Sequence, residues 1–130
     1  MIAVVCGGVG AARFLGGLLD VVAPSDVTAI VNTGDDTVMH GLTICPDLDT
    51  ITYTLSGSVN PETGWGLASE TWKAMDALER LGGETWFRLG DSDLGTHLYR
   101  TARLRAGATL SEVTAEIASA FGLELSILPM

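Results

Sequence analysis

The stretch IAVVCGGVGAARFL, residues 2–15, decides the fold of this chain. Residues 2–6 are apolar and predict a short buried strand, and the glycine-rich residues 7–10 predict a tight turn into a helix over 11–20. A second apolar run at 27–31 completes a strand–helix–strand unit of about 30 residues, the usual size of a crossover between parallel strands. We therefore expect an α/β fold of the Rossmann-like type, with three α/β/α layers and a mostly parallel sheet.

The rest of the chain continues the alternation of helices and strands. Residues 33–50 are rich in Gly and Asp and are predicted to be irregular, and a long structureless segment inside a compact domain is usually functional. Helices are expected over 47–56, 68–80, 93–105 and 110–121, and a third strand over 123–128. A strand in this place is typical of the middle of an α/β domain. We expect residues 1–130 to be the N-terminal part of such a domain, and an incomplete domain by themselves.

The composition excludes several classes of protein. The 130 residues are 47% hydrophobic and 18% charged, a balance that disordered chains lack. The formal net charge of −9 argues against a nucleic-acid partner, which would require basic patches. No apolar run approaches the roughly 18 residues of a membrane span, and no leader-like segment precedes the first strand, so we expect a cytoplasmic protein without a membrane partner. Cys6 and Cys45 are expected to pack as small hydrophobes.

The glycine-rich turn is the first place where chemistry is expected. Gly7, Gly8 and Gly10 let the backbone approach a phosphate closely, and the helix N-terminus behind them supplies N–H donors. Arg13, one turn into the helix, adds a forked cation to the same place. The spacing matches neither GxGxxG nor a P-loop, and a tight turn that binds nothing carries the same glycines. Both interpretations stay open at this point.

Polar residues follow the second strand, at the edge where open α/β sheets bind ligands. Asn32, Asp35 and Asp36 lie in the segment NTGDD, and adjacent carboxylates of this kind hold Mg²⁺ or accept a hydrogen bond from a hydroxyl. A solvated turn is the alternative, since Gly and Asp are common turn residues. Asp47 and Asp49 follow soon after. One of them is explained as a cap of the next helix, which leaves the other to bind a metal or act as a base.

The segment RLGDSDLGTH, residues 88–97, forms a further cluster. Arg88 is a candidate for contact with an anion. Asp91 and Asp93 are candidates for caps of the following helix. His97 is either a catalytic or a structural histidine.

Two sets of larger side chains have two interpretations each. The arginines of the helix expected at 93–105 form either a solvated face or a phosphate clamp: Arg100, Arg103 and Arg105. The tryptophans either pack in a core or stack on a flat ring: Trp65, Trp72 and Trp86.

Six motifs occur in order along the chain and together carry a resemblance. They are GGVGAARFL (7–15), NTGDD (32–36), PDLDT (46–50), GWG (64–66), RLGDSD (88–93) and TH (96–97). Each motif alone is weak, but their order over the whole chain is specific. The chain resembles the CofD/FbiA family, the 2-phospho-L-lactate transferases of coenzyme F420 biosynthesis. The first motif looks closer to the actinobacterial branch, with its phosphoenolpyruvyl form of the donor.

The resemblance implies a transferase. A lactyl- or enolpyruvyl-diphospho-guanosine would donate its phospho-acid group to the ribityl hydroxyl of the deazaflavin Fo, with release of GMP and the help of Mg²⁺. It implies that Asp49 and Arg88 contact Fo, and Asp49 is also the best-placed base. Our choices for metal or hydroxyl contact are Asp35, Asp36 and Asp49. The expected donor-binding positions around the glycine-rich turn are Gly7, Gly8, Gly10, Arg13 and Asn32. A homodimer is implied for the full-length form.

A second function remains open at this stage. Family members are expected to be more than twice as long as this chain, and a non-catalytic regulatory module that binds a nucleotide or sugar nucleotide would keep the glycine-rich turn. Such a module is expected to lose the segments 46–50 and 88–97. Which acid group the donor carries is also open. If Asp49 binds metal or Fo, we expect Asp49→Asn to abolish transfer and leave the fold intact.

Overall fold

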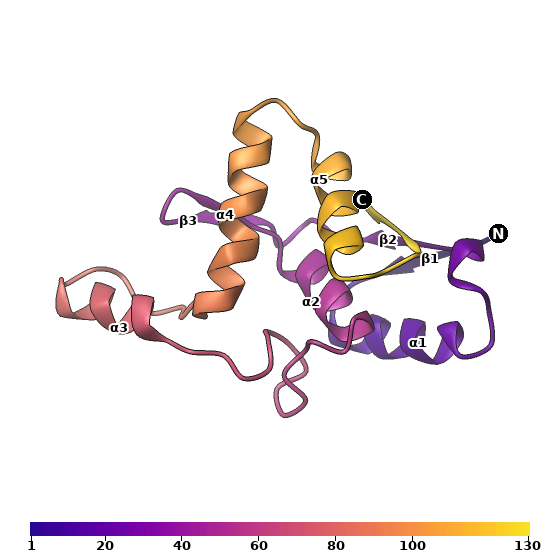
Figure 1. Ribbon diagram of the computed structural model, residues 1–130, viewed down its shortest axis with the longest axis horizontal. Helices are drawn as coiled ribbons and strands as arrows, with labels where there is room; N and C mark the ends of the chain where they lie inside the picture. The colour runs from indigo at the N-terminus through magenta and orange to yellow at the C-terminus, as the bar shows by residue number, and fades with distance from the viewer.

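The computed structural model describes residues 1–130 and contains five β-strands and five α-helices (Figure 1). None of the helices combines the length and the apolar character needed to cross a lipid bilayer. In chain order the elements are β1 (Ile2–Cys6), α1 (Val9–Leu19), β2 (Val27–Val31), β3 (Thr37–Met39), β4 (Leu42–Ile44), α2 (Pro46–Leu55), α3 (Lys73–Arg80), α4 (Asp91–Arg105), α5 (Leu110–Ala120) and β5 (Ser126–Pro129).

The main sheet is parallel, with β2 between β1 and β5. Cys6 is in register with Val31, and Ala29 is in register with Ile127. Side chains in register on neighbouring parallel strands point to the same face, so these residues share one face of the sheet. That face is buried under α1, α2 and α5, and a residue such as Leu15 of α1 is fully buried against it. The predicted parallel α/β arrangement is confirmed.

The other face of the sheet is open within residues 1–130. Val5 of β1 is 71% exposed and Leu128 of β5 is 39% exposed, although both belong to the central sheet. The described chain therefore supplies the sheet and one of the two helical layers that the expected three-layer fold requires.

The segment predicted to be irregular contains a β-hairpin, so that prediction was wrong. Strands β3 and β4 pair antiparallel and are joined by His40 and Gly41, whose φ angles are 53° and 74°. Two successive positive φ angles define the two-residue hairpin turn whose twist matches that of the strands. Its usual sequence signal is Asn-Gly or Asp-Gly, and His-Gly lacks it. The hairpin is fixed to α4 by Arg105, which donates to the Gly41 carbonyl at 2.9 Å.

Three other element boundaries differ from the prediction. The helix expected over 68–80 begins only at Lys73, after a turn at residues 68–69 and an irregular segment over 70–72. The third strand occupies 126–129, because Leu123 closes the end of α5 by donating from its N–H to the Ala118 carbonyl at 3.0 Å. Helix α1 begins at Val9, two residues before the predicted start, and ends at Leu19.

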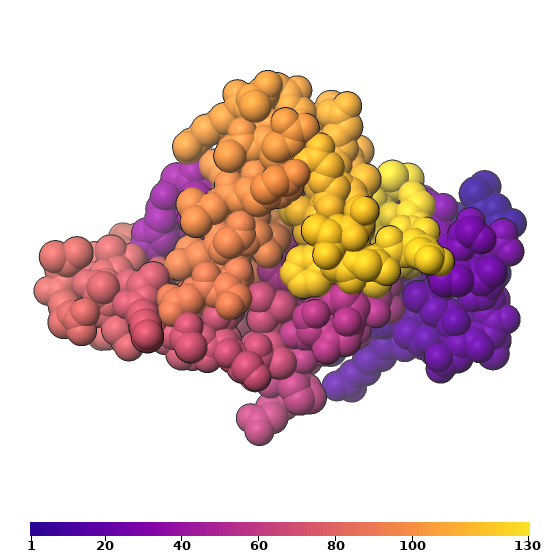
Figure 2. All heavy atoms as spheres, viewed as in Figure 1, coloured from indigo at the N-terminus to yellow at the C-terminus, as the bar shows by residue number.

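The helices that matter for the site lie between the two ends of the molecule. Figure 1 shows α3 at the end away from the main sheet, with α4 and α2 between them. The long irregular segment between α2 and α3 runs along the lower edge of the view in Figure 2, below α4. This course brings residues from α2, α4 and the irregular segment to one place.

Candidate functional site

A cleft of about 320 Å³ opens among α2, α4 and the segments on either side of α3. Its walls are mainly apolar and include the aromatic rings of Trp65, Trp72 and Phe87. Its floor is polar and ionisable, with Asp49 from α2 and His97 from α4. Flat apolar walls over a few convergent polar groups are typical of a site for a small aromatic ligand.

Helix α2 supplies the floor because of how it begins. Pro46 occupies the first turn, where its missing N–H costs nothing, and Asp47 and Asp49 follow near the positive end of the helix dipole. Two residues apart on a helix, their side chains point in nearly opposite directions. One of the two side chains was expected to cap the helix, but neither does. The N-cap is Cys45, which makes no side-chain cap hydrogen bond.

Asp49 is paired with a buried arginine of α4. Arg100 is 2% exposed and donates to Asp49 Oδ1 and, at 3.3 Å, to the Thr43 carbonyl of β4. A third contact joins Arg100 Nη1 to His97 Nδ1 at 3.3 Å. Because a guanidinium has only donors, His97 Nδ1 must accept this hydrogen bond, and the proton of the neutral ring then lies on Nε2.

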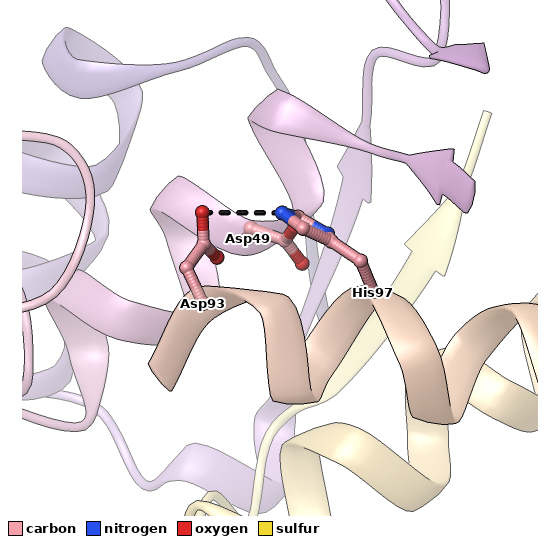
Figure 3. A group of neighbouring side chains, drawn as sticks. All are labelled: Asp49, Asp93 and His97. Carbon is pink, nitrogen blue, oxygen red and sulfur yellow. Dashed lines mark ion pairs between the residues drawn. The ribbon is translucent and has the colours of Figure 1, made fainter. Parts of the chain in front are cut away.

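Figure 3 shows Asp93 and His97 projecting from α4 toward Asp49 of α2. His97 Nε2 lies 3.1 Å from Asp93 Oδ2, and His97 Nδ1 lies 3.7 Å from Asp49 Oδ2. The Tyr53 hydroxyl of α2 donates to Asp93 Oδ1 at 2.6 Å. The floor is therefore a continuous network of ionisable groups that joins the two helices.

Burial sets the protonation of this network. It raises the pKa of Asp49 to about 6, against the opposing charge and hydrogen bond of Arg100. Burial also raises the pKa of Asp93, but the nearby His97 ring and the hydrogen bond from Tyr53 outweigh it, so the net pKa is lowered. For Arg100, burial lowers the pKa and the Asp49 carboxylate more than restores it, so the guanidinium stays charged.

Three buried polar atoms have no hydrogen-bond partner: Asp36 Oδ1, Asp49 Oδ2 and His97 Nε2. Nε2 is within ion-pair distance of Asp93 but makes no hydrogen bond of good geometry with it. Buried polar atoms without a hydrogen-bond partner are rare in folded proteins, and a bound ligand would give them one. Ligand atoms of Asp49, Asp93 and His97 all lie within 4.8 Å of one another, so these three form a candidate cation site. A cation held there by His97 would have to displace the proton that the Arg100 contact places on Nε2. Asp35 and Asp36, which we also expected to bind metal, are not in this group.

The glycine-rich turn is occupied by the other carboxylate of α2. A Cβ at Gly8 would lie 3.1 Å from Asp47 Oδ1, so this glycine is required by close approach of a side chain. Asn32 Nδ2 holds Asp47 Oδ2 at 2.8 Å and also reaches Asp35 Oδ2 at 3.3 Å. The structure therefore brings Asn32, Asp35 and Asp47 to the turn and sends Asp49 to the cleft. Gly7 makes a similar, looser approach to Asp47.

The turn and the cleft are close to each other. A Cβ at Gly64 would lie 3.1 Å from Val9 and 3.9 Å from the guanidinium of Arg13, both in α1. The neighbouring residues Trp65 and Gly66 line the cleft. The irregular segment thus spans from the N-terminus of α1 to the cleft wall. At Gly10, a Cβ would meet nothing within 4 Å, so no close contact requires a glycine there.

Arg88 lines the cleft, as its expected role in binding requires. Its guanidinium pairs with Asp76 and, at 3.6 Å, with Glu79 of α3, and lies 5.9 Å from the ring centre of Trp72. Part of its charge is thus already balanced within the protein.

Several residues of the site were not found from the sequence. Arg100 is neither on a solvated face nor in a phosphate clamp, and the other two arginines of α4 bind Glu116 and the Gly41 carbonyl. Tyr53 was assigned only to a helix. A signal was present in the spacing of Asp93, His97 and Arg100, which places all three on one face of a helix. The tryptophans do not pack in a core: two line the cleft, and Trp86 is 77% exposed.

The fold and the site define a parallel α/β protein of the Rossmann-like class, with a cleft whose floor is ionisable. Within that class the chain belongs to the CofD family, because the family model described as 2-phospho-L-lactate transferase CofD matches residues 2–130.

Curated relatives agree with this family. A "Phosphoenolpyruvate transferase" of Nocardia farcinica is 50% identical over 129 residues, which cover 98% of this chain and 39% of the relative. A protein of the same name from Kitasatospora aureofaciens is 48% identical over 99% of this chain and 41% of its own length. Another from Mycolicibacterium smegmatis is 50% identical over 87% of this chain and 38% of its own length. The chain thus spans about two fifths of the length of the curated relatives it matches.

Proposed function

We propose that residues 1–130 are the N-terminal part of a transferase domain and carry its acceptor site. The acceptor is the deazaflavin Fo, the donor is a guanosine diphosphate linked to phospholactate or phosphoenolpyruvate, and GMP leaves, in coenzyme F420 biosynthesis. The observation that carries the proposal is one cleft with aromatic walls above the acidic floor of Asp49. The family and the names of the relatives support it.

The chemistry of the cleft suits this acceptor. A tricyclic ring needs flat apolar contacts, and Trp65, Trp72 and Phe87 offer them. The ribityl chain carries hydroxyls, which need polar partners, and the floor supplies carboxylates. Arg88 at the wall offers donors to the ring carbonyls or to the chain.

The transfer itself requires few groups from the protein. The oxygen of the acceptor hydroxyl forms a bond to the phosphorus that bears the acid group, and the bond from that phosphorus to the oxygen of GMP breaks. GMP keeps the electron pair, and the hydroxyl proton passes to a base. We assign Asp49 as this base, because it lies in the floor and its pKa of about 6 leaves it ionised at neutral pH.

The donor is assigned to the glycine-rich turn, with Gly7, Gly8, Gly10, Arg13 and Asn32 as its contacts. Two observations bear on the distance between the turn and the cleft. Asp47 at the turn and Asp49 in the cleft are two residues apart in α2, and the irregular segment at Gly64 contacts α1. A donor phosphate at the turn is therefore close to an acceptor in the cleft.

Mg²⁺ is assigned to the carboxylates between these two places. The residues fit a hard cation, because Asp36 and Asp49 each keep a buried oxygen without a partner. Asp35, Asp36 and Asp49 are the proposed ligands, and of these Asp49 is the one that lies in the compact group with Asp93 and His97. When bound, the ion would neutralise charge on the diphosphate during transfer.

The test is product formation from Fo and the guanosine donor in Mg²⁺, followed as GMP released per Fo modified. We expect Arg88→Ala to raise KM for Fo more than KM for the donor. Arg80→Ala is the matched control, because Arg80 is an exposed arginine of the neighbouring α3 with no ion pair. A larger effect on the donor would move Arg88 to the diphosphate site. Nucleotide binding without GMP release would favour the regulatory binding module instead.

A further inference from the structure

Helices α3 and α4 exchange their N-terminal caps. The Asp91 carboxylate, at the start of α4, accepts from the backbone N–H groups of Lys73 and Ala74 in α3, both at 3.0 Å. In return, the Glu70 carboxylate, just before α3, accepts from the N–H groups of Ser92 and Asp93 in α4, at 2.8 and 3.1 Å. Thus Asp91, the first residue of α4, caps α3, and Glu70, in the segment before α3, caps α4.

Neither helix has a cap of its own. The N-cap residues are Trp72 and Gly90, and neither makes a side-chain cap hydrogen bond. The first N–H groups of a helix have no partner within it, so they depend on an outside acceptor. Two more hydrogen bonds close the exchange: Thr71 Oγ1 donates to Asp91 at 2.6 Å, and the Asp91 N–H donates to the Thr71 carbonyl at 2.9 Å.

The exchange leaves no free space at its centre. A Cβ at Gly90 would lie 2.2 Å from Cγ and Cδ of Glu70. The φ of Gly90 is −68°, which any residue adopts, so the glycine is there for space and not for its backbone freedom. The Glu70 side chain passes through the position that another residue would fill.

The two joined segments are walls of the cleft. Glu70 and Trp72 line it from the segment before α3. Leu89 and Gly90 line it from the segment that leads into α4, and Asp93 lines it from the first turn of α4. The cap exchange therefore sets the separation between an aromatic wall and the Asp93 carboxylate, which lies 3.1 Å from His97 Nε2.

We propose that Glu70 and Asp91 are positioning residues of the cleft. They act through Trp72 and Asp93, by holding the two walls at the separation that a flat ligand needs, and do no chemistry themselves. The identity of that ligand as Fo rests on the proposed function. This role is separate from those of Asp49, Arg88 and the glycine-rich turn.

The test uses isosteric variants, Glu70→Gln and Asp91→Asn, which keep the volume but place an NH₂ group against a backbone N–H. Amide hydrogen exchange is measured together with Fo binding by deazaflavin fluorescence. We expect faster exchange at Ser92 and Asp93 in Glu70→Gln and at Lys73 and Ala74 in Asp91→Asn, with about a tenfold rise in the Kd for Fo in each. The double variant is expected to weaken binding little further, since both act on one contact.

The matched control is Glu84→Gln, an exposed carboxylate in the loop after α3 with no hydrogen bond. Faster exchange with an unchanged Kd would make the caps structural only and overturn the proposal, as would unchanged exchange at both helix ends. Failure of the wild-type chain to bind Fo would instead remove the acceptor assignment, and the exchange data would still decide whether the caps hold the two walls together.

Discussion

At the scale of single residues, Asp49 has a structural role that its motif does not indicate. It is the counter-ion of Arg100, and both side chains are buried. Removing one partner of such a pair leaves an uncompensated buried charge. The expectation that Asp49→Asn leaves the fold intact stays a prediction, because burial favours the uncharged form of this side chain.

We predict that Arg100→Met, which leaves the buried Asp49 carboxylate without its counter-ion, lowers the free energy of unfolding by about 3 kcal/mol or more, measured by urea denaturation. Arg100→Met/Asp49→Asn removes both charges and is expected to be more stable than Arg100→Met alone. Arg80→Met, at an exposed arginine without an ion pair, should change the free energy by less than about 0.5 kcal/mol. An Arg100→Met protein as stable as Arg80→Met would show that Asp49 does not depend on Arg100.

The second residue-scale prediction concerns protons. The carboxyl carbon of Asp49 should titrate with a midpoint near pH 6 in an NMR experiment, because burial raises its pKa. The folded state then holds this proton more tightly than the unfolded state. The stability that Asp49 contributes is thus fully present below about pH 4 and is lost as the pH rises through 6. Asp91 should titrate below its usual range, because Thr71 and backbone N–H groups bond to its carboxylate. A midpoint near 4 for Asp49 would contradict its burial.

At the scale of elements, Gly90, the N-cap of α4, and Gly95, inside α4, should respond in opposite ways to replacement by alanine. Gly90→Ala is expected to displace Glu70 and cost about 1 kcal/mol or more, through the lost caps of α4. Gly95→Ala places a Cβ where nothing lies within 4 Å, inside the helix, and should stabilise by about 1 kcal/mol. The comparison is made by thermal and urea unfolding. Equal stability of the two variants would show that Glu70 does not occupy the space at Gly90.

Helices and strands with long hydrophobic patterns were predicted more accurately from the sequence than short ones. Strands β1 and β2 are continuous apolar runs, and both were predicted with their correct bounds. The hairpin of β3 and β4 has three residues in each strand, too few for alternation to show, and a His-Gly turn. The cap exchange joins residues about twenty positions apart, so no local pattern announces it.

At the scale of the whole molecule, one face of the main sheet is open within residues 1–130. Val5 and Leu128 present apolar surface there, and exposed apolar sheet surface promotes association. We predict that the 130-residue chain self-associates at high concentration and that Val5→Lys reduces this, as measured by sedimentation. Val38→Lys, on an equally apolar but separate strand with 67% exposure, is the control and should have less effect. Unchanged association in Val5→Lys would show that the sheet face is not the contact.

The site was predicted in its parts but not in its arrangement. Asp49 and Arg88 were expected in one place, and both line the cleft. The direction of Asp47 was not predictable, because it depends on α2 beginning at Pro46 and so turning the two carboxylates apart. Arg100 was missed because an arginine on a helix is usually solvated, and only the packing of α4 against β4 and α2 buries it.

The most direct test of the acceptor site is a fluorescence titration of the chain with Fo in the presence of Mg²⁺. We predict saturable binding at one site, weakened about tenfold by Trp72→Ala, whose ring lines the cleft, and unchanged by Trp86→Ala, whose ring does not. A folded chain that shows no saturable binding, or a Trp72→Ala variant that binds as tightly as the wild type, would contradict the assignment of this cleft as the acceptor site.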